Sequence, residues 1–200
     1  MLKLPQVTLV ALSGIDYQTK ENIEALKKSC EGIEWGAVKY IQQASITSID
    51  SWNEAIIYDL PKYIDTEFAF LAHSDGYPKN PGCWREDFLL YDYIGAPWPL
   101  PMDPYSYRDE SGGLVRVGNS VSIRSKKLMD LIAQTPREYF RSFKEKYGNT
   151  NEDGYICCHN RQYLESRGIK FAPLEIAKYF SKEHEIPENQ GIETFAFHSL

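Results

Sequence analysis

A short apolar run at residues 68–72 places the strongest constraint on the fold of this chain. The run contains only Phe, Leu and Ala, is too short for most helices, and is typical of a strand buried on both faces. It stops abruptly at His73, Ser74, Asp75 and Gly76. A buried strand that ends in a carboxylate is the usual way in which an α/β sheet presents chemistry to a ligand. Asp followed by Gly is also typical of a simple turn, so this segment alone leaves both interpretations open.

The first quarter of the chain predicts a β-α-β unit. Residues 7–12 form an apolar run typical of a buried strand, and residues 19–31 show the helical spacing of apolar side chains. A second strand is expected at residues 35–41, and such units usually carry parallel strands. Because 42% of the 200 residues are hydrophobic, the chain can bury a sizeable core. We therefore expect one α/β domain over residues 1–200, with a central, mostly parallel mixed sheet flanked by helices.

Capping patterns predict where later helices begin. Ser51 and Glu54 match a capping box for a helix that ends before Pro61. Thr150 or Asn151 is expected to cap a long helix that continues to residue 167. Further helices are expected at residues 126–133 and 137–146, and further strands at residues 93–96, 117–123 and 169–172.

Residues 98–116 have a different character. Three prolines and two adjacent glycines interrupt this stretch, and tyrosines and charged residues lie between them. An irregular segment of this length inside a domain is usually functional or disordered. We interpret it as a mobile flap near a ligand, with a passive surface loop as the alternative.

Charge and motifs exclude several classes of function. The net charge is −6 and no segment concentrates Lys and Arg, which argues against a nucleic-acid-binding protein. Neither a G-x-G-x-x-G motif nor a Walker loop is present, which disfavours dinucleotide dehydrogenases and P-loop enzymes. No apolar run is long enough to span a bilayer, and the first residues lack the apolar core of a signal peptide.

The four cysteines indicate a reducing compartment. Cys30, Cys83, Cys157 and Cys158 show no C-x-x-C spacing, and a disulfide scaffold is uncommon at this chain length. A zinc site at residues 157–159 lacks the usual ligand spacing. We therefore expect a cytoplasmic protein, or one in the host cytoplasm if its source is a virus.

Polar residues that end or open predicted elements could meet at one site. The first strand ends at Ser13 and Gly14, and the central strand ends at Asp75, so both lie at the carboxyl edge of the expected sheet. Glu152 and Asp153 open a helix, where acidic residues also simply stabilise the helix dipole. His198 lies among aromatic residues near the chain end, although a histidine there is ordinarily only part of a tail.

The sequence resembles a family of glycosyltransferase-like domains found in bacteria and large DNA viruses. The matching residues are Asn80, Pro81, Trp84, residues 88–99, residues 117–119, residues 122–128 and residues 151–153. The most specific part is residues 91–99, Tyr-Asp-Tyr-Ile-Gly-Ala-Pro-Trp-Pro. The match covers residues 50–198, and residues 1–50 agree in pattern only. A domain of this kind would correspond to the amino-terminal glycosyltransferase domain of a chlorella-virus multidomain enzyme, with further domains in a longer native chain.

The wider resemblance is to the GT-A fold of nucleotide-sugar-dependent transferases, in which an Asp-x-Asp motif holds a divalent cation. Here the matching triplet is His73, Ser74 and Asp75, so the first aspartate is replaced by histidine. The resemblance implies that Asp75 and His198 bind the metal, Mn²⁺ or Mg²⁺. His73 would contact the ribose or a metal-bound water. Where the family usually reads Gly-Asn-Gly-Gly, this chain has Ser and Val at positions 120 and 121.

The resemblance further implies a nucleotide-binding part at about residues 1–100 and an acceptor and catalytic part at about residues 101–200. The residues expected to bind the donor are Leu12, Ser13, Gly14, Asp16, Tyr17, His73, Ser74, Asp75, Gly118 and Asn119. The expected activity is metal-dependent transfer of a sugar from a nucleoside-diphosphate sugar, a UDP-sugar, to a glycan hydroxyl. Asp153 is the expected catalytic carboxylate, with Glu152 as the second choice. In an inverting enzyme it would take the proton of the acceptor hydroxyl, and in a retaining enzyme it would stabilise positive charge on the sugar; the sequence leaves both open.

Two other functions compete with glycosyl transfer. The replacement of the first aspartate by His73 leaves open a non-catalytic module that binds nucleotide-sugars or glycans. A nucleotidyltransferase should carry a basic, glycine-rich loop after its first strand, and residues 13–18 contain no Lys or Arg.

Overall fold

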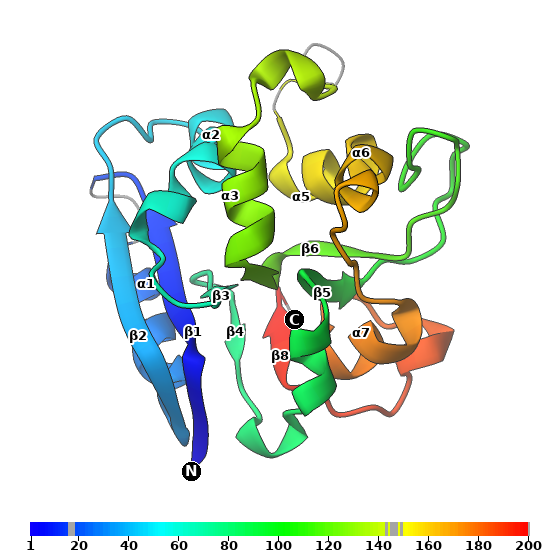
Figure 1. Cartoon of the computed structure of the whole chain (residues 1–200). Helices are drawn as coiled ribbons and strands as arrows, with labels where there is room; N and C mark the ends of the chain where they lie inside the picture. The colour runs from blue at the N-terminus through cyan, green and yellow to red at the C-terminus, as the bar shows by residue number, and fades with distance from the viewer. Residues whose placement is uncertain (16–18, 143, 145–147, 149, 200) are drawn as a thin grey trace.

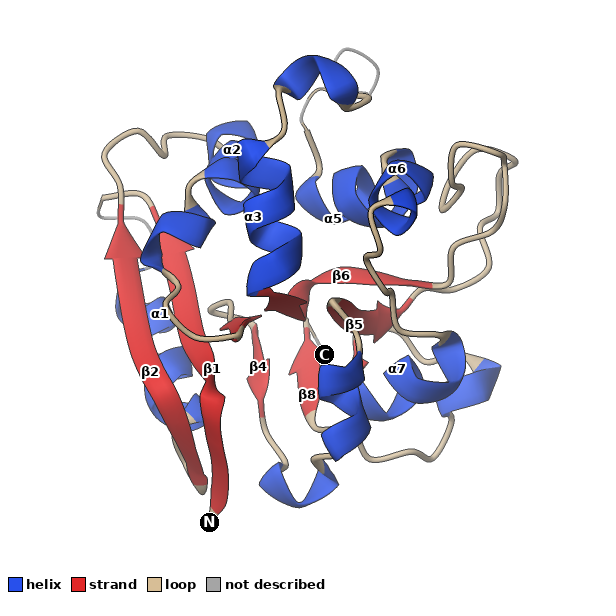
Figure 2. Ribbon diagram, viewed as in Figure 1, coloured by secondary structure: helices blue, strands red, loops and turns tan. Residues whose placement is uncertain are grey.

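A computed structural model describes residues 1–15, 19–142, 144, 148 and 150–199. Its centre is a five-stranded mixed sheet in the order β2-β1-β3-β6-β5, flanked by helices (Figures 1 and 2). The strands are β1 Leu2–Ser13, β2 Ile33–Gln42, β3 Phe68–Leu71, β5 Tyr93–Pro97 and β6 Val117–Ser125. Strands β2, β1 and β3 are parallel, whereas β6 is antiparallel to both β3 and β5. The expected α/β class with a mixed central sheet is confirmed.

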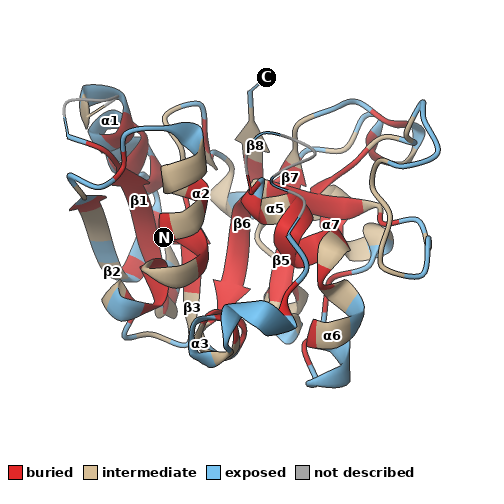
Figure 3. Cartoon of the chain, turned by 90° about the horizontal axis from the view of Figure 1, so that it is seen from above, coloured by how far each residue is buried: buried red, intermediate tan, exposed pale blue. Residues whose placement is uncertain are grey.

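The alternation of side chains along β1 and β3 divides the core between the two faces of the sheet. Leu9 and Phe70 pack with α1 Thr19–Ser29 and α7 Leu174–Phe180 on one face. Val10 and Leu71 pack with α2 Ile49–Tyr58 and α3 Lys126–Gln134 on the other face. Because both faces of β3 are covered, its run is apolar at every position rather than at every second one (Figure 3).

A second, small sheet joins the chain end to the centre of the molecule. It has the order β4-β8-β7, with β4 Gly76–Pro78, β7 Ser181–Lys182 and β8 Ala196–His198. Strand β4 follows β3 after one tight turn, and its Gly76 pairs with His198 of β8. The antiparallel pairing therefore brings the last ordered strand to the carboxyl end of β3.

Two predicted helices differ from the structure. The helix predicted from Ser51 begins at Ile49 and is capped by Ser48, because Ser48 and Ser51 exchange hydrogen bonds between side chain and backbone. The helix predicted from residue 151 to 167 is broken into α5 Glu152–Gly154, a π-helical turn Tyr155–His159 and α6 Arg161–Ser166. It breaks at Asn160, whose side chain bonds to the backbone of Arg141 and Tyr155.

Two other predicted elements are reduced in the structure. The helix predicted at residues 137–146 is only a 3₁₀ turn at Arg137–Tyr139, and part of that segment lies outside the described residues. The strand predicted at residues 169–172 makes a single bridge between Phe171 and Tyr93. Other 3₁₀ turns occur at Leu60–Tyr63, Pro81–Cys83, Glu86–Leu90 and Pro187–Asn189. Within the described part of the chain, no helix has the length and apolar character needed to cross a bilayer.

Residues 98–116 form a loop, called the flap below, that is tied to the rest of the protein. Arg108 and Leu114 make a β-bridge inside it. The Glu110 carboxylate accepts the backbone N–H of Gln162 at the start of α6, 3.0 Å away. Arg116 pairs with Glu188 at 3.2 Å. These contacts attach the tip and the carboxyl-terminal end of the flap to the rest of the protein.

Gly118 on β6 lies where a side chain would not fit, and this leads to a stability prediction. A Cβ atom at Gly118 would lie 2.1 Å from ring carbons of Trp98, which is far inside van der Waals contact. Gly118→Ala should therefore lower the free energy of unfolding by about 1–3 kcal/mol or more, because the buried indole must move. Urea unfolding followed by tryptophan fluorescence measures this. The matched control is Gly82→Ala, since a Cβ there meets nothing within 4 Å. Equal midpoints for the two variants would contradict this packing argument.

Candidate functional site

Three potential metal ligands meet at the carboxyl end of β3. The chain turns back between His73 and Gly76, where the His73 N–H donates to the Gly76 carbonyl at 2.7 Å. This turn holds His73 and Asp75, and the pairing of β8 with β4 adds His198. One ligand atom from each of the three side chains lies within 4.8 Å of the others.

The His198 ring is oriented so that its Nε2 faces Asp75. Nε2 lies 3.6 Å from Asp75 Oδ1, whereas Nδ1 lies 3.5 Å from Glu183 Oε1 and 3.0 Å from the amide nitrogen of Asn119. A carboxylate on one ring nitrogen commonly orients the other nitrogen toward a metal. Burial lowers the pKa of His198, but the hydrogen bond with Glu183 and the charge of Asp75 outweigh it and raise the pKa overall.

His73 provides a neutral imidazole. Its ring lies between those of Trp52 and His198, with both centroids 5.1 Å away and edge-to-face geometry. Its Nε2 is buried and has no hydrogen-bond partner among the described residues. Burial, reinforced by the positive charge of His198, lowers the pKa of His73 to about 3. The ring therefore keeps a nitrogen lone pair over the whole physiological pH range.

The three side chains form a possible metal site. Two donors that each lie about 2.1 Å from one ion are separated by about 3.0–3.4 Å in octahedral or tetrahedral geometry. The 3.6 Å between His198 Nε2 and Asp75 Oδ1 is close to this range. Two imidazoles and one carboxylate are a common ligand set for first-row transition metals.

A cavity of about 760 Å³, called the strand-end cavity, adjoins this cluster. It lies between the end of β1, the turn after β3 and the start of α2. Among its lining residues are Leu12, Ser13, Gly14, Trp52, His73, Ser74, Asp75, Asn151 and His198. The side chain of Trp52 donates to the Leu12 carbonyl at 2.8 Å, which fixes one wall. At Gly14 a Cβ would lie 2.2 Å from the Ile46 carbonyl oxygen, so the wall approaches too closely for any other residue.

The structure brings most of the predicted donor-binding residues to this cavity, but not all of them. Asp16 and Tyr17 lie outside the described residues. Gly118 and Asn119 line neither of the two cavities described in this section. Asn119 is buried with a φ of 84°, and its side-chain oxygen accepts the Val121 N–H at 2.9 Å. That bond directs the Asn119 amide nitrogen toward His198.

Glu152 and Asp153 occupy opposite environments at the start of α5. Glu152 lies in the core, where Oε2 accepts a hydrogen bond from Arg124 Nη2 at 2.7 Å and both side chains are 1% exposed. Asp153 instead lies in a cavity wall, and its Oδ1 accepts the Gly154 N–H at 2.7 Å. Burial, together with the negative charge of Glu152, raises the pKa of Asp153 to about 7, and Arg124 opposes this shift.

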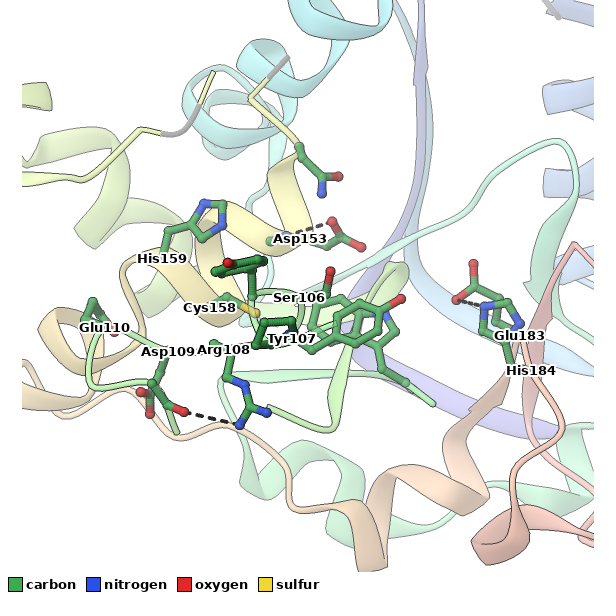
Figure 4. Close-up of a pocket in the computed structure, with 16 residues that line it drawn as sticks. Ser106, Tyr107, Arg108, Asp109, Glu110, Asp153, Cys158, His159, Glu183 and His184 are labelled. Carbon is green, nitrogen blue, oxygen red and sulfur yellow. Dashed lines mark hydrogen bonds and ion pairs between the residues drawn. The ribbon is translucent and has the colours of Figure 1, made fainter. Parts of the chain in front are cut away.

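Asp153 belongs to a second cavity of about 820 Å³, called the flap cavity (Figure 4). Its walls are the flap, the residues around α5 and the segment after β7. Figure 4 labels Tyr107, Asp109 and Glu110 from the flap, together with Asp153, Glu183 and His184. Asn151 lines both cavities, so they adjoin at the start of α5.

Comparison with known proteins gives a family but no activity. A family model described as "Protein of unknown function (DUF5672)" matches residues 37–198. The chain belongs to this family. The match includes the strand-end turn, the flap, α5 and His198. No curated protein matches the chain.

A solved structure resembles this member of the family over nearly its whole length. It is described as a glycosyltransferase involved in the glycosylation of the major capsid of PBCV-1. The match covers 96% of this chain and 92% of that chain, with a TM-score of 0.54 and 11% sequence identity. At this identity the likeness shows a shared fold.

The sequence analysis did not identify Glu183 as a functional residue. Glu183 follows the two-residue strand β7 and reaches His198 only because β7 pairs with β8. No local pattern marks it, since an acidic residue among other charged residues resembles ordinary solvent-exposed sequence. Trp52 and Asn151 were likewise not predicted as lining residues.

The buried Arg124–Glu152 pair leads to a second prediction. Arg124→Met should lower the free energy of unfolding by about 3–5 kcal/mol, because it leaves the Glu152 carboxylate buried and unpaired. The double variant Arg124→Met with Glu152→Leu should recover much of that loss. Urea unfolding of the unmodified protein, the two single variants and the double variant measures this. Breaking the exposed Lys3–Glu34 pair by Lys3→Met is the control and should change little. Additive losses in the double variant would contradict the coupling.

Proposed function

We propose that this protein is a metal-dependent glycosyltransferase that moves a sugar from a UDP-sugar to a hydroxyl of a glycan. The observation that carries the proposal is the cluster of His73, Asp75 and His198, which opens into the strand-end cavity. Asp153 lies in the cavity next to it. The fold shared with the PBCV-1 glycosyltransferase also supports glycosyl transfer as the proposed activity.

The strand-end cavity is the proposed donor site, in the first half of the chain. Leu12, Ser13 and Gly14 would contact the nucleoside, and the next residues of the chain include Asp16 and Tyr17. Asp75, His198 and His73 would hold the cation. As a Lewis acid, the cation would stabilise the negative charge of the leaving diphosphate. Gly118 and Asn119 would act on the donor indirectly, since Gly118 leaves room for Trp98 and Asn119 contacts His198.

Asp153 is the proposed catalytic carboxylate. Its raised pKa of about 7 suits a group that must take a proton from a sugar hydroxyl near neutral pH. Glu152 is the weaker candidate, because its oxygens lie in the core and one of them accepts from Arg124. Its role is to hold the first turn of α5 in place beside the cavity.

The proposed compartment is reducing, such as the cytoplasm. All four cysteines are free, and Cys157 and Cys158 are buried. Burial raises the pKa of Cys158 to about 12, which keeps this thiol unreactive.

The metal assignment gives a third prediction. Because the site offers two imidazoles and one carboxylate, Mn²⁺ should bind at least about tenfold more tightly than Mg²⁺. Asp75→Asn should weaken Mn²⁺-dependent binding of UDP at least about tenfold. Isothermal titration calorimetry with each ion, and then with UDP, measures both effects. His73→Asp should narrow the preference for Mn²⁺ over Mg²⁺, because it replaces a nitrogen donor by oxygen.

Asp65→Asn is the matched control for Asp75→Asn, since Asp65 is an exposed aspartate paired with Lys39. It should leave the affinities for Mn²⁺ and UDP unchanged. Equal UDP affinity in Asp75→Asn and Asp65→Asn would overturn the metal assignment. Tight Mn²⁺ and UDP binding with no turnover of any UDP-sugar would instead favour a binding module.

The role of Asp153 gives a fourth prediction. Asp153→Asn should reduce turnover by about 100-fold or more without weakening UDP binding, because the amide cannot accept the proton. In the unmodified protein kcat/KM should rise as the pH increases through about 7, where Asp153 loses its proton. Asp130→Asn in α3 is the control, since this aspartate pairs with Lys126 and lines neither cavity. Wild-type turnover in Asp153→Asn would contradict the catalytic role.

Thermal unfolding of Asp153→Asn provides a readout that does not depend on activity. The folded-state pKa of Asp153 lies above its unfolded value near 4, so ionisation opposes folding. The unmodified protein should therefore lose stability as the pH rises from about 4 through about 7, and Asp153→Asn should lack this loss. Asp153→Asn should be more stable than the unmodified protein at pH 8, and the two should be equally stable at pH 4.

A further inference from the structure

The flap cavity has a strongly acidic lining. The carboxylates of Asp109, Glu110, Asp153 and Glu183 line it. Arg108 is the one arginine or lysine among its described lining residues, and its guanidinium donates to the Gly112 carbonyl within the flap. The carboxylates outnumber this single guanidinium, so the lining carries an excess of negative charge. A phosphate or carboxylate entering the cavity would meet charge of its own sign in a partly desolvated space.

Tyr107 gives the cavity an aromatic surface at a conformational cost. Its ring stacks on Trp98 with the centroids 4.7 Å apart and an interplanar angle of 21°. The backbone of Tyr107 has a φ of 53°, an uncommon value for a bulky residue that is maintained only when the surroundings enforce it. Burial, followed by the charge of Glu183, raises the pKa of Tyr107, so its hydroxyl stays protonated. The half-buried ring thus offers an apolar face next to several hydrogen-bond acceptors.

The wall that carries Tyr107 is fixed in place. Glu110 holds the flap tip to α6, and the Tyr107 carbonyl accepts the Val115 N–H at 2.7 Å. The Arg116 side chain donates to the Trp98 carbonyl at 3.0 Å and so links the two ends of the flap. These contacts hold the flap wall in place, so binding need not order the flap.

We propose that the flap cavity binds the acceptor as an uncharged sugar ring and discriminates against phosphorylated or carboxylated sugars. Carboxylates accept hydrogen bonds from sugar hydroxyls, and a tyrosine face packs against the C–H face of a pyranose. The shared residue Asn151 and the position of Asp153 connect this cavity to the strand-end cavity.

The role as acceptor site rests on the proposed glycosyltransferase function, whereas the preference for uncharged sugars rests on the cavity alone. In the transfer, a bond forms between the acceptor oxygen and the anomeric carbon of the donor sugar. The bond from that carbon to the diphosphate oxygen breaks, and the diphosphate leaves with the electron pair. The acceptor proton moves to the Asp153 carboxylate.

Ligand-observed saturation-transfer NMR on the full chain tests the proposal without any turnover. The probes are the methyl glycosides of glucose, galactose, mannose, xylose and fucose, with methyl glucuronide and glucose 6-phosphate as anionic counterparts. We expect at least one neutral glycoside to bind, and both anions to bind at least about tenfold more weakly at low ionic strength. No binding by any neutral glycoside, or tighter binding by an anion, overturns the proposal.

Variants connect the binding to this cavity. Tyr107→Ala should abolish or weaken glycoside binding at least about fivefold, whereas Tyr139→Ala, on a surface turn outside the cavity, should leave it unchanged. Glu110→Gln keeps an acceptor for the α6 N–H and removes one negative charge, so it should reduce the discrimination against anions about threefold. Equal effects of Tyr107→Ala and Tyr139→Ala would overturn the assignment to this cavity.

Competition with UDP and Mn²⁺ separates this inference from the proposed function. If UDP displaces the glycoside, the sugar occupies the strand-end cavity and the inference is wrong, whereas the transferase proposal stands. If the glycoside binds in the presence of UDP, the flap cavity holds it. Glycoside binding without turnover of any UDP-sugar would overturn the proposed function and leave the sugar site in place.

Discussion

The buried ion pair between Arg124 and Glu152 is the interaction on which the arrangement of the two cavities depends. Arg124 lies on β6 in the central sheet and Glu152 lies in the first turn of α5, so the pair joins the sheet to that turn. Two well-packed apolar residues would often stabilise a fold equally well, because burying two charges is costly. The ion pair also fixes the orientation of the first turn of α5 relative to β6, since an ion pair has one favourable geometry. With Glu152 turned toward the sheet, its neighbour Asp153 is left in the wall of the flap cavity.

The metal cluster depends on a different constraint, which is the pairing of β8 with β4. His73 and Asp75 lie two positions apart on one turn, but His198 is more than a hundred residues away along the chain. The register that places His198 opposite Gly76 brings the three side chains together. The same small sheet includes β7, which carries Glu183 to the other side of the His198 ring. The three-residue strand β8 therefore positions His198 beside Asp75 and, through its pairing with β7, also places Glu183 next to the His198 ring.

What the sequence predicts well is what local physics determines. The apolar runs of β1 and β3 identify buried parallel strands, and the shared direction of these strands brings the polar residues at their ends to one cavity. Glu183 and the contact of Asn119 with His198 could not be predicted, because they depend on strand pairing between distant segments. The break in the helix at Asn160 has a similar cause, since its side chain bonds to Arg141, nineteen residues earlier. Ser51 was placed at the wrong position of its capping box because its spacing to Glu54 matches the usual pattern, whereas in the structure Ser48 is the N-cap and Ser51 takes the place of the usual Glu or Gln.

The electrostatic difference between the two cavities follows from these constraints. The strand-end cavity has a single acidic side chain, Asp75, among its described lining residues, together with two imidazoles suited to a cation. It can therefore accommodate a diphosphate once a cation is held there. Four carboxylates line the flap cavity, and its described residues form no cluster of metal ligands like that of His73, Asp75 and His198, so an anionic ligand is disfavoured in it. The two cavities adjoin at Asn151, so a cavity that suits an anion bound to a cation lies directly beside one that disfavours anions. In a transfer between a charged donor and a neutral acceptor, this difference in potential would direct each substrate to its own side of α5.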